Sequence, residues 1–284
     1  MQENNIAGSP LWKATRAILI HGGLIFGAII MILPLFWMVS TALKTYPETL
    51  AYPPTWLPSK FQWQNFVAAW HSQKYFAQYF YNSFYVTVLT MITEVVMTIF
   101  ASYAFARMNF LGKNLLFGLF LSTMMIPGEV LLVPNFITVT KLGWYDTYAA
   151  LIIPFTVSVF AIFLLRQHFL QIPFELQEAA YLDGAGHTRF LFQIMLPLSR
   201  PPIATIALLK FISSWNAFLW PLLVTQKATL RTVPIGLTSL MQDEGLQYHI
   251  LMSAATMALI PVLLVFLVAQ KQFLESVAKS GLKG

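Results

Sequence analysis

Long apolar stretches alternate with short polar segments along the whole chain. An apolar layer about 30 Å thick is crossed by about 20 helical residues, each rising 1.5 Å. The pattern predicts six such membrane helices, over 18–39, 85–105, 115–133, 148–165, 203–224 and 250–268. The first stretch exceeds the apolar core of about 7 to 15 residues found in signal peptides, so we interpret it as a span. Pro127, Gly128 and Glu129 interrupt the third helix and predict a bent or re-entrant outer end packed in protein.

Lys and Arg are divided unevenly between the two sets of loops. Ten lie in the N-terminal tail, in the loops after the second and fourth helices and in the C-terminal tail, whereas six lie in the opposite loops. Because cytoplasmic loops retain basic residues, this bias places both termini in the cytoplasm. The predicted organisation is a cytoplasmic tail over 1–17, a membrane domain over 18–270 that includes a cytoplasmic loop over 167–202, and a second cytoplasmic tail over 271–284.

Composition agrees with a membrane protein and excludes several kinds of site. Of the 284 residues, 10% are charged and 57% are apolar, whereas soluble domains carry about 25% charge. The net charge of +6 is scattered, which argues against a nucleic-acid-binding stripe. The chain has no Cys, its His residues show no metal-ligand spacing, and its one Gly-Lys pair, Gly112-Lys113, lacks the other residues of a phosphate-binding P-loop.

The cytoplasmic loop carries the most specific pattern in the sequence. Pro173 suits the first turn of a helix, Glu175 and Glu178 suit its positive N-terminal end, and Gly184 suits the position after its last turn. These signals predict a helix from about Pro173 to Asp183. A second short helix is predicted from Thr188 to Met195, ended by Pro197.

This loop, EAAYLDGAG followed by RFLFQIMLPLSRP, closely resembles the EAA loop of ABC-importer permeases. Further segments resemble the carbohydrate-uptake branch of that family, including maltose and glycerol-3-phosphate permeases: NSFYVT, YAFAR, MMIPGEVLLVPNFITVTKLGWYDTYAALIIP, WNAFLWPL and the C-terminal SGLKG. The resemblance covers essentially the whole chain. It implies the type I importer permease fold, an all-α membrane protein with six transmembrane helices and a cytoplasmic coupling helix, in a bacterial cytoplasmic membrane.

The resemblance also implies partners and residue roles. The coupling helix would dock on a cytoplasmic ATPase dimer that binds ATP and magnesium, so this chain itself would bind no cofactor and would not be an enzyme. A second homologous permease would complete a heterodimeric pore, and an extracytoplasmic substrate-binding protein would receive the outer loop 225–247. The residues expected at the ATPase are Glu178, Ala179, Ala180, Asp183, Gly184, Ala185, Leu196 and Pro197, with Ser280 and Gly281 of the C-terminal tail. The competing interpretation is an ordinary amphipathic loop on the membrane surface.

Two charged residues and one polar cluster are candidates for the transport path. Glu94 and Lys210 lie inside predicted spans, where a charge costs about 2.5 to 3.5 kcal/mol at the centre, so both are expected to face protein or water. They would either line the path or form a pair. For Lys210 the alternative is an ammonium group that reaches toward the cytoplasm. Ser214, Trp215 and Asn216 combine a ring with hydroxyl and amide groups, as sugar sites do, or pack helices together.

The sequence therefore predicts a permease subunit of an ATP-driven importer of a sugar, oligosaccharide or polyol. One alternative is glycerol 3-phosphate import by the same type of complex, and another is an ion-coupled secondary transporter that would use Glu94 as its coupling site. The predicted partners also include the lipid bilayer and a small-molecule substrate, and they exclude nucleic acid.

Overall fold

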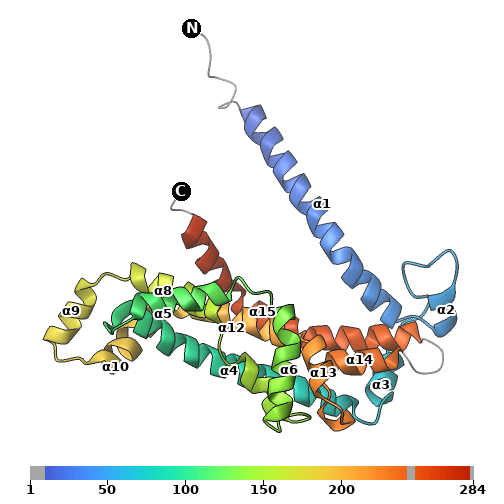
Figure 1. The fold of residues 1–284 in the computed structure, drawn as a ribbon. Coiled ribbons are helices and arrows are strands. Elements are labelled where there is room, and N and C mark those ends of the chain that lie inside the picture. The colour runs from blue at the N-terminus through green and yellow to red at the C-terminus, as the bar shows by residue number, and fades with distance from the viewer. Residues whose placement is uncertain (1–9, 242–246, 282–284) are drawn as a thin grey trace. The chain divides into compact units, whose positions relative to one another are not determined.

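The computed structural model describes residues 10–241 and 247–281, and every regular element in these ranges is a helix (Figure 1). Side chains are described over 12–241 and 247–271. The chain divides into two compact units, one of Met1–Ser72 with Leu240–Met257 and the other of Gln73–Ser239 with Ala258–Gly284. Each unit is described by itself below.

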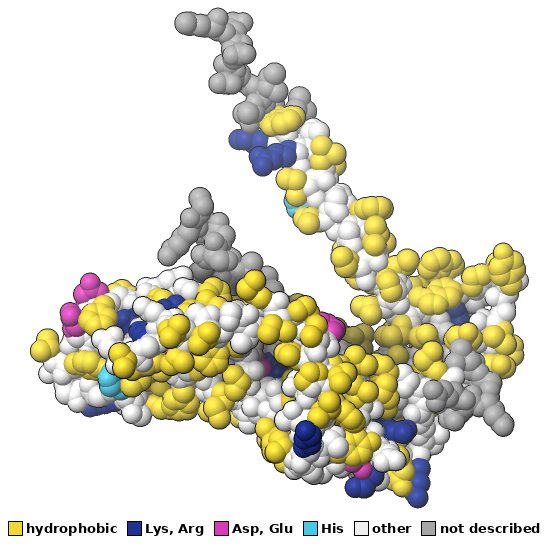
Figure 2. All heavy atoms as spheres, in the orientation of Figure 1, with side chains coloured by type: hydrophobic (Ala, Val, Ile, Leu, Met, Phe, Trp, Pro, Cys, Tyr) yellow, Lys and Arg dark blue, Asp and Glu magenta, His cyan; other side chains and the backbone are white. Residues whose placement is uncertain are grey.

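The first unit begins with α1 (Pro10–Ala42), a long apolar helix followed by the short helices α2 (Tyr46–Leu50) and α3 (Gln64–His71). Hydrophobic side chains follow α1 along its length (Figure 2), and none of its most apolar window is buried against the rest of the chain. An unpacked apolar helix of 33 residues is long enough to cross a bilayer with its surface in lipid.

A compact polar turn follows α1. The buried Lys44 ammonium donates to the Thr55 carbonyl and lies 4.3 Å from the centre of the Trp37 ring. Burial lowers the pKa of Lys44, although the Glu48 carboxylate acts in the opposite direction. Hydrogen bonds from Ser59 and Thr45 lower the pKa of Glu48 to about 2.

The second unit is built on three helices, α4 (Phe76–Arg107), α8 (Val159–Gln171) and α12 (Arg200–Trp215). Around them lie α5 (Lys113–Thr123), α6 (Leu132–Lys141), α7 (Tyr148–Ile152), α13 (Leu219–Val224) and α14 (Val233–Leu240). The loop between α8 and α12 forms α9 (Glu175–Leu182), α10 (His187–Phe190) and α11 (Leu196–Leu198). The last helix, α15 (Tyr248–Gly281), has residues in both units.

Two apolar clusters in the second unit account for its internal packing. One joins Tyr103 of α4, Leu165 and Phe169 of α8, and Phe190 with Met195 of the loop helices. The other joins α4 to α6, α7 and α13 around Val86, Val139, Leu151, Trp220 and Val224. The first cluster therefore fixes the loop between α8 and α12 on the long helices, and the second fixes the opposite end of α4.

Four helices are long and apolar enough to cross a membrane, Trp12–Ala42, Phe76–Arg107, Tyr148–Gln171 and Tyr248–Lys271. Two bent pairs raise the number to six among the described residues if each is one span: Lys113–Thr123 with Gly128–Lys141, bent by 92°, and His187–Leu198 with Arg200–Trp215, bent by 78°. The break predicted at Pro127 to Glu129 is thus confirmed.

Other expected boundaries differ from the structure. The fifth predicted span is not one helix, because α12 ends at Trp215 and α13 begins at Leu219. The fourth is bent by a 3-10 turn over Ile153–Phe155, where Pro154 cannot donate a helical hydrogen bond. Both ends of the membrane domain are also helical beyond the expected limits, since α1 starts at Pro10 and α15 continues to Gly281.

Candidate functional site

The loop after α8 contains the helix that its sequence predicts. The chain enters α9 at Phe174, whose carbonyl accepts from the backbone N–H groups of Gln177 and Glu178 at 2.9 and 3.1 Å. Glu175 and Glu178 lie in the first turn, where negative charge is stabilised by the helix dipole. The observed bounds, Glu175–Leu182, lie within two residues of the expected ones.

Gly184 ends α9 in a left-handed turn. Its φ is +77°, a conformation that costs other residues about 1–2 kcal/mol. The Gly184 N–H donates to the Tyr181 carbonyl at 3.0 Å, and the Ala185 N–H donates to the Ala180 carbonyl at 2.9 Å. This pair of bonds satisfies the last helical carbonyls, with Asp183 as the capping residue.

The two alanines expected to form one docking surface point in different directions. Ala179 is exposed together with Glu178, but Ala180 is only 6% exposed and packs in the apolar cluster with Phe169 and Phe190. The expectation that Ala180 faces a partner is therefore wrong, because the protein's own core takes that side of α9. Ala185 and Leu196 also pack against this cluster, whereas Asp183, Gly184 and Pro197 are exposed.

Leu182 is a docking candidate that sequence reasoning missed. It is 89% exposed at the end of α9, beside the exposed Glu178 and Ala179 face, and is the most exposed large apolar side chain of the 167–202 loop. In Figure 2 acidic and hydrophobic side chains gather at the end of the second unit formed by α9. The signal in the sequence was a leucine three residues after Ala179 and four after Glu178, a spacing that puts all three on one face of a helix.

The end of α4 holds this loop in place through two polar side chains from YAFAR. The Arg107 guanidinium donates to the carbonyls of Phe169 (2.7 Å) and Ile172, where α8 ends and the loop begins. The Tyr103 hydroxyl lies 2.9 Å from His187 Nδ1, and the Tyr181 hydroxyl lies 2.8 Å from the same nitrogen. These contacts connect α4 to both short loop helices.

The second loop helix is longer than predicted. It begins at His187, continues through a π-helical turn over Leu191–Met195 and extends to Leu198, past the expected stop at Pro197. Proline normally breaks a helix because its ring collides with the carbonyl four residues earlier. The wider turn immediately before Pro197 provides room for that ring, so the helix continues.

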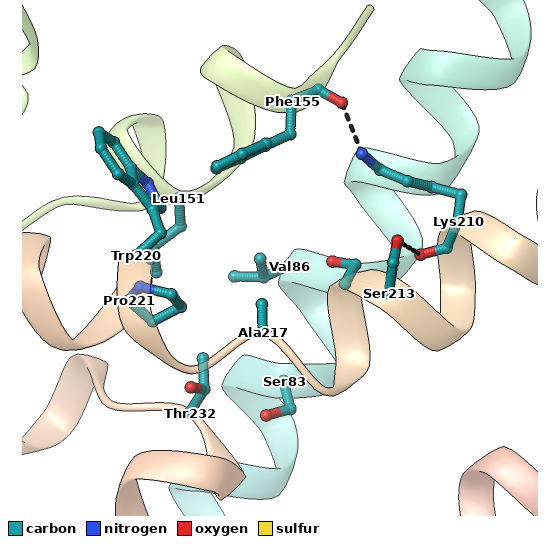
Figure 3. Close-up of a pocket in the computed structure, with 11 residues that line it drawn as sticks. Ser83, Val86, Leu151, Phe155, Lys210, Ser213, Ala217, Trp220, Pro221 and Thr232 are labelled. Atoms are coloured by element: carbon teal, nitrogen blue, oxygen red, sulfur yellow. Dashed lines mark hydrogen bonds between the residues drawn. The ribbon is translucent and has the colours of Figure 1, made fainter. Parts of the chain in front are cut away.

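Glu94 and Lys210 form an ion pair inside the second unit. Lys210 Nζ lies 2.7 Å from Glu94 Oε2, and their side chains are 12% and 7% exposed. Lys210 Nζ also donates to the Phe155 carbonyl at 2.9 Å, which becomes available where α7 and α8 are separated (Figure 3). The ion pair is one of the alternatives that the sequence left open, and it joins Lys210 of α12 to α4, while the Phe155 carbonyl joins it to the break between α7 and α8.

A cavity of about 190 Å³ lies beside Lys210. Figure 3 shows Lys210 and Ser213 on its right, Ser83 and Thr232 at the bottom, and Leu151, Trp220 and Pro221 on the left. Its full lining comprises Ser83, Val86, Leu151, Phe155, Lys210, Ser213, Ser214, Ala217, Trp220, Pro221 and Thr232.

The polar cluster at the end of α12 is divided by the structure. Ser214 lines the cavity, whereas the Trp215 ring is 3% exposed, stacks on Phe211 and donates its indole N–H to the Ala258 carbonyl at 3.0 Å. The Asn216 amide donates to the Ile212 carbonyl in its own helix. Trp215 thus makes the packing contact of the alternative interpretation, Asn216 bonds only within its own helix, and Ser214 alone of the three lines the cavity.

The opposite end of α4 carries the NSFYVT segment, whose role also becomes visible. The buried Asn82 amide donates to the carbonyls of Thr229 and Arg231 at 2.9 and 2.8 Å, and its oxygen accepts from Gln78 and Tyr148. All its hydrogen-bonding positions are used to hold the segment after α13.

A second contact anchors the start of the same segment. Asp146 accepts from the backbone N–H groups of Gln226 and Lys227 and pairs with the Lys227 ammonium at 3.2 Å. Burial alone would raise the pKa of Asp146, but these hydrogen bonds and the cation of Lys227 lower it.

The remaining expected site residues lie at or beyond the limits of the description. Ser280 and Gly281 belong to the last turn of α15, but their side chains lie outside the described residues. The outer loop 225–247 is described except for residues 242–246. Among the described residues, no group of three His, Asp or Glu side chains could hold a metal ion.

Comparison with known proteins gives consistent matches over most of the chain. The profile of a family described as "Binding-protein-dependent transport system inner membrane component" matches residues 95–279. The arabinooligosaccharides transport system permease protein AraQ of Halalkalibacterium halodurans is 33% identical, with 92% of this chain and 95% of that protein aligned. The sn-glycerol-3-phosphate transport system permease protein UgpE of Yersinia enterocolitica is also 33% identical, with 93% and 96% aligned.

The fold matches a solved structure as well. A chain of a bacterial ABC transporter involved in the import of the acidic polysaccharide alginate superimposes with a TM-score of 0.80 and 23% identity, covering 92% of this chain and 98% of that one. A second structure, of a bacterial alginate ABC transporter in complex with an alginate pentasaccharide-bound periplasmic protein, superimposes with a TM-score of 0.65 and 18% identity.

Proposed function

The chain belongs to the binding-protein-dependent transport system inner membrane component family, and from that premise we propose that it is the permease subunit of an ATP-driven importer of a sugar, oligosaccharide or polyol. The observation that carries the proposal is α9, a capped helix whose Glu178, Ala179 and Leu182 side chains are exposed while its opposite side packs on the core. A rigid helix with a free outer surface suits a lever moved by another protein.

The topology we propose has six spans and both termini in the cytoplasm of a bacterial inner membrane. The bent pair His187–Leu198 with Arg200–Trp215 is not one span in this topology, because His187–Leu198 belongs to the cytoplasmic loop. α12 alone is about 24 Å long at 1.5 Å per residue, short of a core about 30 Å thick, so α13 completes the fifth span. The third span is the bent pair formed by α5 and α6. The excess of Lys and Arg in alternate loops supports this orientation and places the 167–202 loop in the cytoplasm.

Three protein partners complete the proposed machine. A cytoplasmic ATPase dimer binds ATP and magnesium and contacts α9, because this sequence lacks a P-loop. A second, homologous permease forms the other half of the pore. An extracytoplasmic binding protein delivers the cargo to the outer loops, which Asn82 and Asp146 hold in place.

The cargo class has a close competitor in glycerol 3-phosphate. The relatives named for arabinooligosaccharides and for sn-glycerol-3-phosphate are equally similar to this chain, at 33% identity each. Identity with relatives therefore does not separate a neutral cargo from an anionic one. The ion-coupled secondary transporter is set aside, because the family is one of binding-protein-dependent permeases and Glu94 is already paired with Lys210.

The test is uptake by the complex purified with its co-isolating subunits and reconstituted in vesicles. We expect an ATPase and a second permease to co-purify, and uptake to continue after the ion gradient is collapsed while ATP is maintained. Isolation as a homo-oligomer whose uptake stops with the gradient would overturn the proposal.

Two variants then test α9 itself. Gly184→Val strains the turn at φ +77°, and Glu178→Lys reverses the exposed charge, so both are expected to uncouple transport from ATP hydrolysis without loss of membrane insertion. Gly143→Val is the matched control, because Gly143 has a φ of +72° and equally open surroundings but lies between α6 and α7. Normal coupling in both loop variants would mean that α9 is not the lever.

A further inference from the structure

The cavity beside Lys210 has a mixed lining. Leu151, Phe155 and Trp220 give it apolar walls, and Ser83, Ser213, Ser214 and Thr232 give it hydroxyl groups. At about 190 Å³ it is smaller than the pockets of about 300 to 1,000 Å³ that hold drug-sized ligands. The space therefore suits one sugar ring or a short polyol and is too small for a whole oligosaccharide.

Two of the hydroxyl groups in the lining have unused hydrogen-bonding capacity. Thr232 is 5% exposed, and its Oγ1 has no hydrogen-bond partner among the described residues. Ser83 Oγ accepts from the Val233 N–H at 2.8 Å, so its own proton remains free to be donated. A buried hydroxyl without a partner is unfavourable, and a ligand hydroxyl in the cavity would relieve that cost.

The charge of the lining is cancelled by its surroundings. Lys210 is the only charged side chain among the described residues that line the cavity. Its ammonium is 2.7 Å from the Glu94 carboxylate, and its remaining hydrogen-bonding capacity is directed partly to the Phe155 carbonyl. Whichever of the two groups holds the proton, the pair has a net charge of zero.

An anion in the cavity would have to compete with Glu94 for Lys210. If the ammonium turned to the anion, the carboxylate would be left unpaired within a few ångströms of a second negative charge, which is costly in a poorly hydrated site. A neutral ligand faces no such competition.

We propose that this cavity receives an uncharged, polyhydroxylated part of the cargo, and that the Glu94–Lys210 pair excludes phosphate esters and uronates by cancelling the charge of the lining. This inference rests on the proposed function, because the ligand of the cavity is the cargo only if the chain is an importer subunit. It selects the neutral sugar or polyol over glycerol 3-phosphate.

The test reads the cavity directly, without the binding protein. Because the natural chain has no Cys, Ser213→Cys introduces a single thiol at the lining, whose reaction with anionic and cationic thiosulfonate reagents is followed on this subunit in the intact complex. Each labelling rate is divided by the rate of the same reagent with a free thiol in solution. The ratio of the anionic to the cationic normalised rate then reports the local charge. We expect a ratio near one.

Removing one member of the pair should shift this ratio in a defined direction. Glu94→Gln leaves Lys210 uncompensated and should favour the anionic reagent by about tenfold, whereas Lys210→Met should favour the cationic reagent. Opposite shifts from the two variants cannot both come from misfolding. The double variant should restore the ratio, and Glu129→Gln, which neutralises an exposed carboxylate, should leave it unchanged.

Protection by solutes identifies the ligand class. Arabinose or glycerol should slow labelling of the thiol in the parent background, and glycerol 3-phosphate should slow it only after Glu94→Gln. A parent cavity that already favours the anionic reagent, an unchanged ratio in Glu94→Gln, or protection of the parent by glycerol 3-phosphate alone would overturn the inference. The proposed function is tested separately, by measuring whether uptake depends on ATP.

Discussion

Arg107 is the strongest single connection between a membrane helix and the loop that carries α9. Replacing it by Met keeps the apolar stem and removes the bonds to the Phe169 and Ile172 carbonyls. Each hydrogen bond from a charged donor contributes about 1.5–3 kcal/mol, so the pair contributes about 3–6 kcal/mol. Because Arg107 is 9% exposed and both bonds are buried, the freed carbonyls lose their partners, and we expect at least the lower end of that range.

A loss of about 3 kcal/mol corresponds to an increase of about 100-fold in the population of the released loop. Hydrogen exchange of the α9 amides, measured by mass spectrometry on the complex in nanodiscs, should accelerate by that factor in Arg107→Met. Arg189→Met is the control, since Arg189 is exposed and bonds only to the Gln193 side chain. Exchange in Arg107→Met equal to that of the control would refute the assignment of Arg107 as the anchor.

Three further outcomes follow from individual side chains. Leu182→Ser should change the free energy of unfolding of the permease by no more than about 0.5 kcal/mol, because Leu182 is 89% exposed. It should nevertheless weaken co-purification of the ATPase, and undiminished co-purification would exclude Leu182 from the contact. Gly236→Ala places a methyl group 2.3 Å from the Tyr79 ring and should lower the thermal midpoint. The double variant that also carries Tyr79→Leu should recover the midpoint. If the double variant does not recover, the ring is not the obstacle. Glu48 stabilises the turn after α1 only while it is ionised, and its pKa is depressed to about 2. The thermal-midpoint difference between the natural protein and Glu48→Gln should therefore be constant above about pH 5 and shrink as the pH falls toward 2. A difference that grows on acidification would contradict that sign.

Local signals allowed α9 to be predicted from the sequence. Pro173, the acidic first turn and Gly184 act within a few residues, so their effect does not depend on distant parts of the chain. The break at Pro127 was predictable for the same reason, since proline removes a backbone donor wherever it occurs. The cost of an isolated charge in a span predicted that Glu94 and Lys210 would face protein or water, but it left open whether they pair.

Orientation and tertiary partners were not predictable in the same way. Ala180 faces inward because Phe169 and Phe190, which come from two other helices, pack on that side of α9. Residues 216–218, which separate α12 from α13, include no proline or glycine that would predict a helix break. Phe155 became a partner of Lys210 because a bend in another span exposed its carbonyl, which no local pattern in α12 could indicate.

The pairing of Glu94 with Lys210 also has a consequence for biosynthesis. The two residues are 116 positions apart in the chain. At about 5–20 residues per second, the ribosome delivers the second about 6 to 23 s after the first. During that interval α4 carries an unmatched carboxylate and is a poor candidate for release into lipid. We therefore expect α4 to remain at the insertion machinery until α12 arrives, so that assembly of this permease is sequential. Truncated chains that end before Lys210 should be prone to degradation.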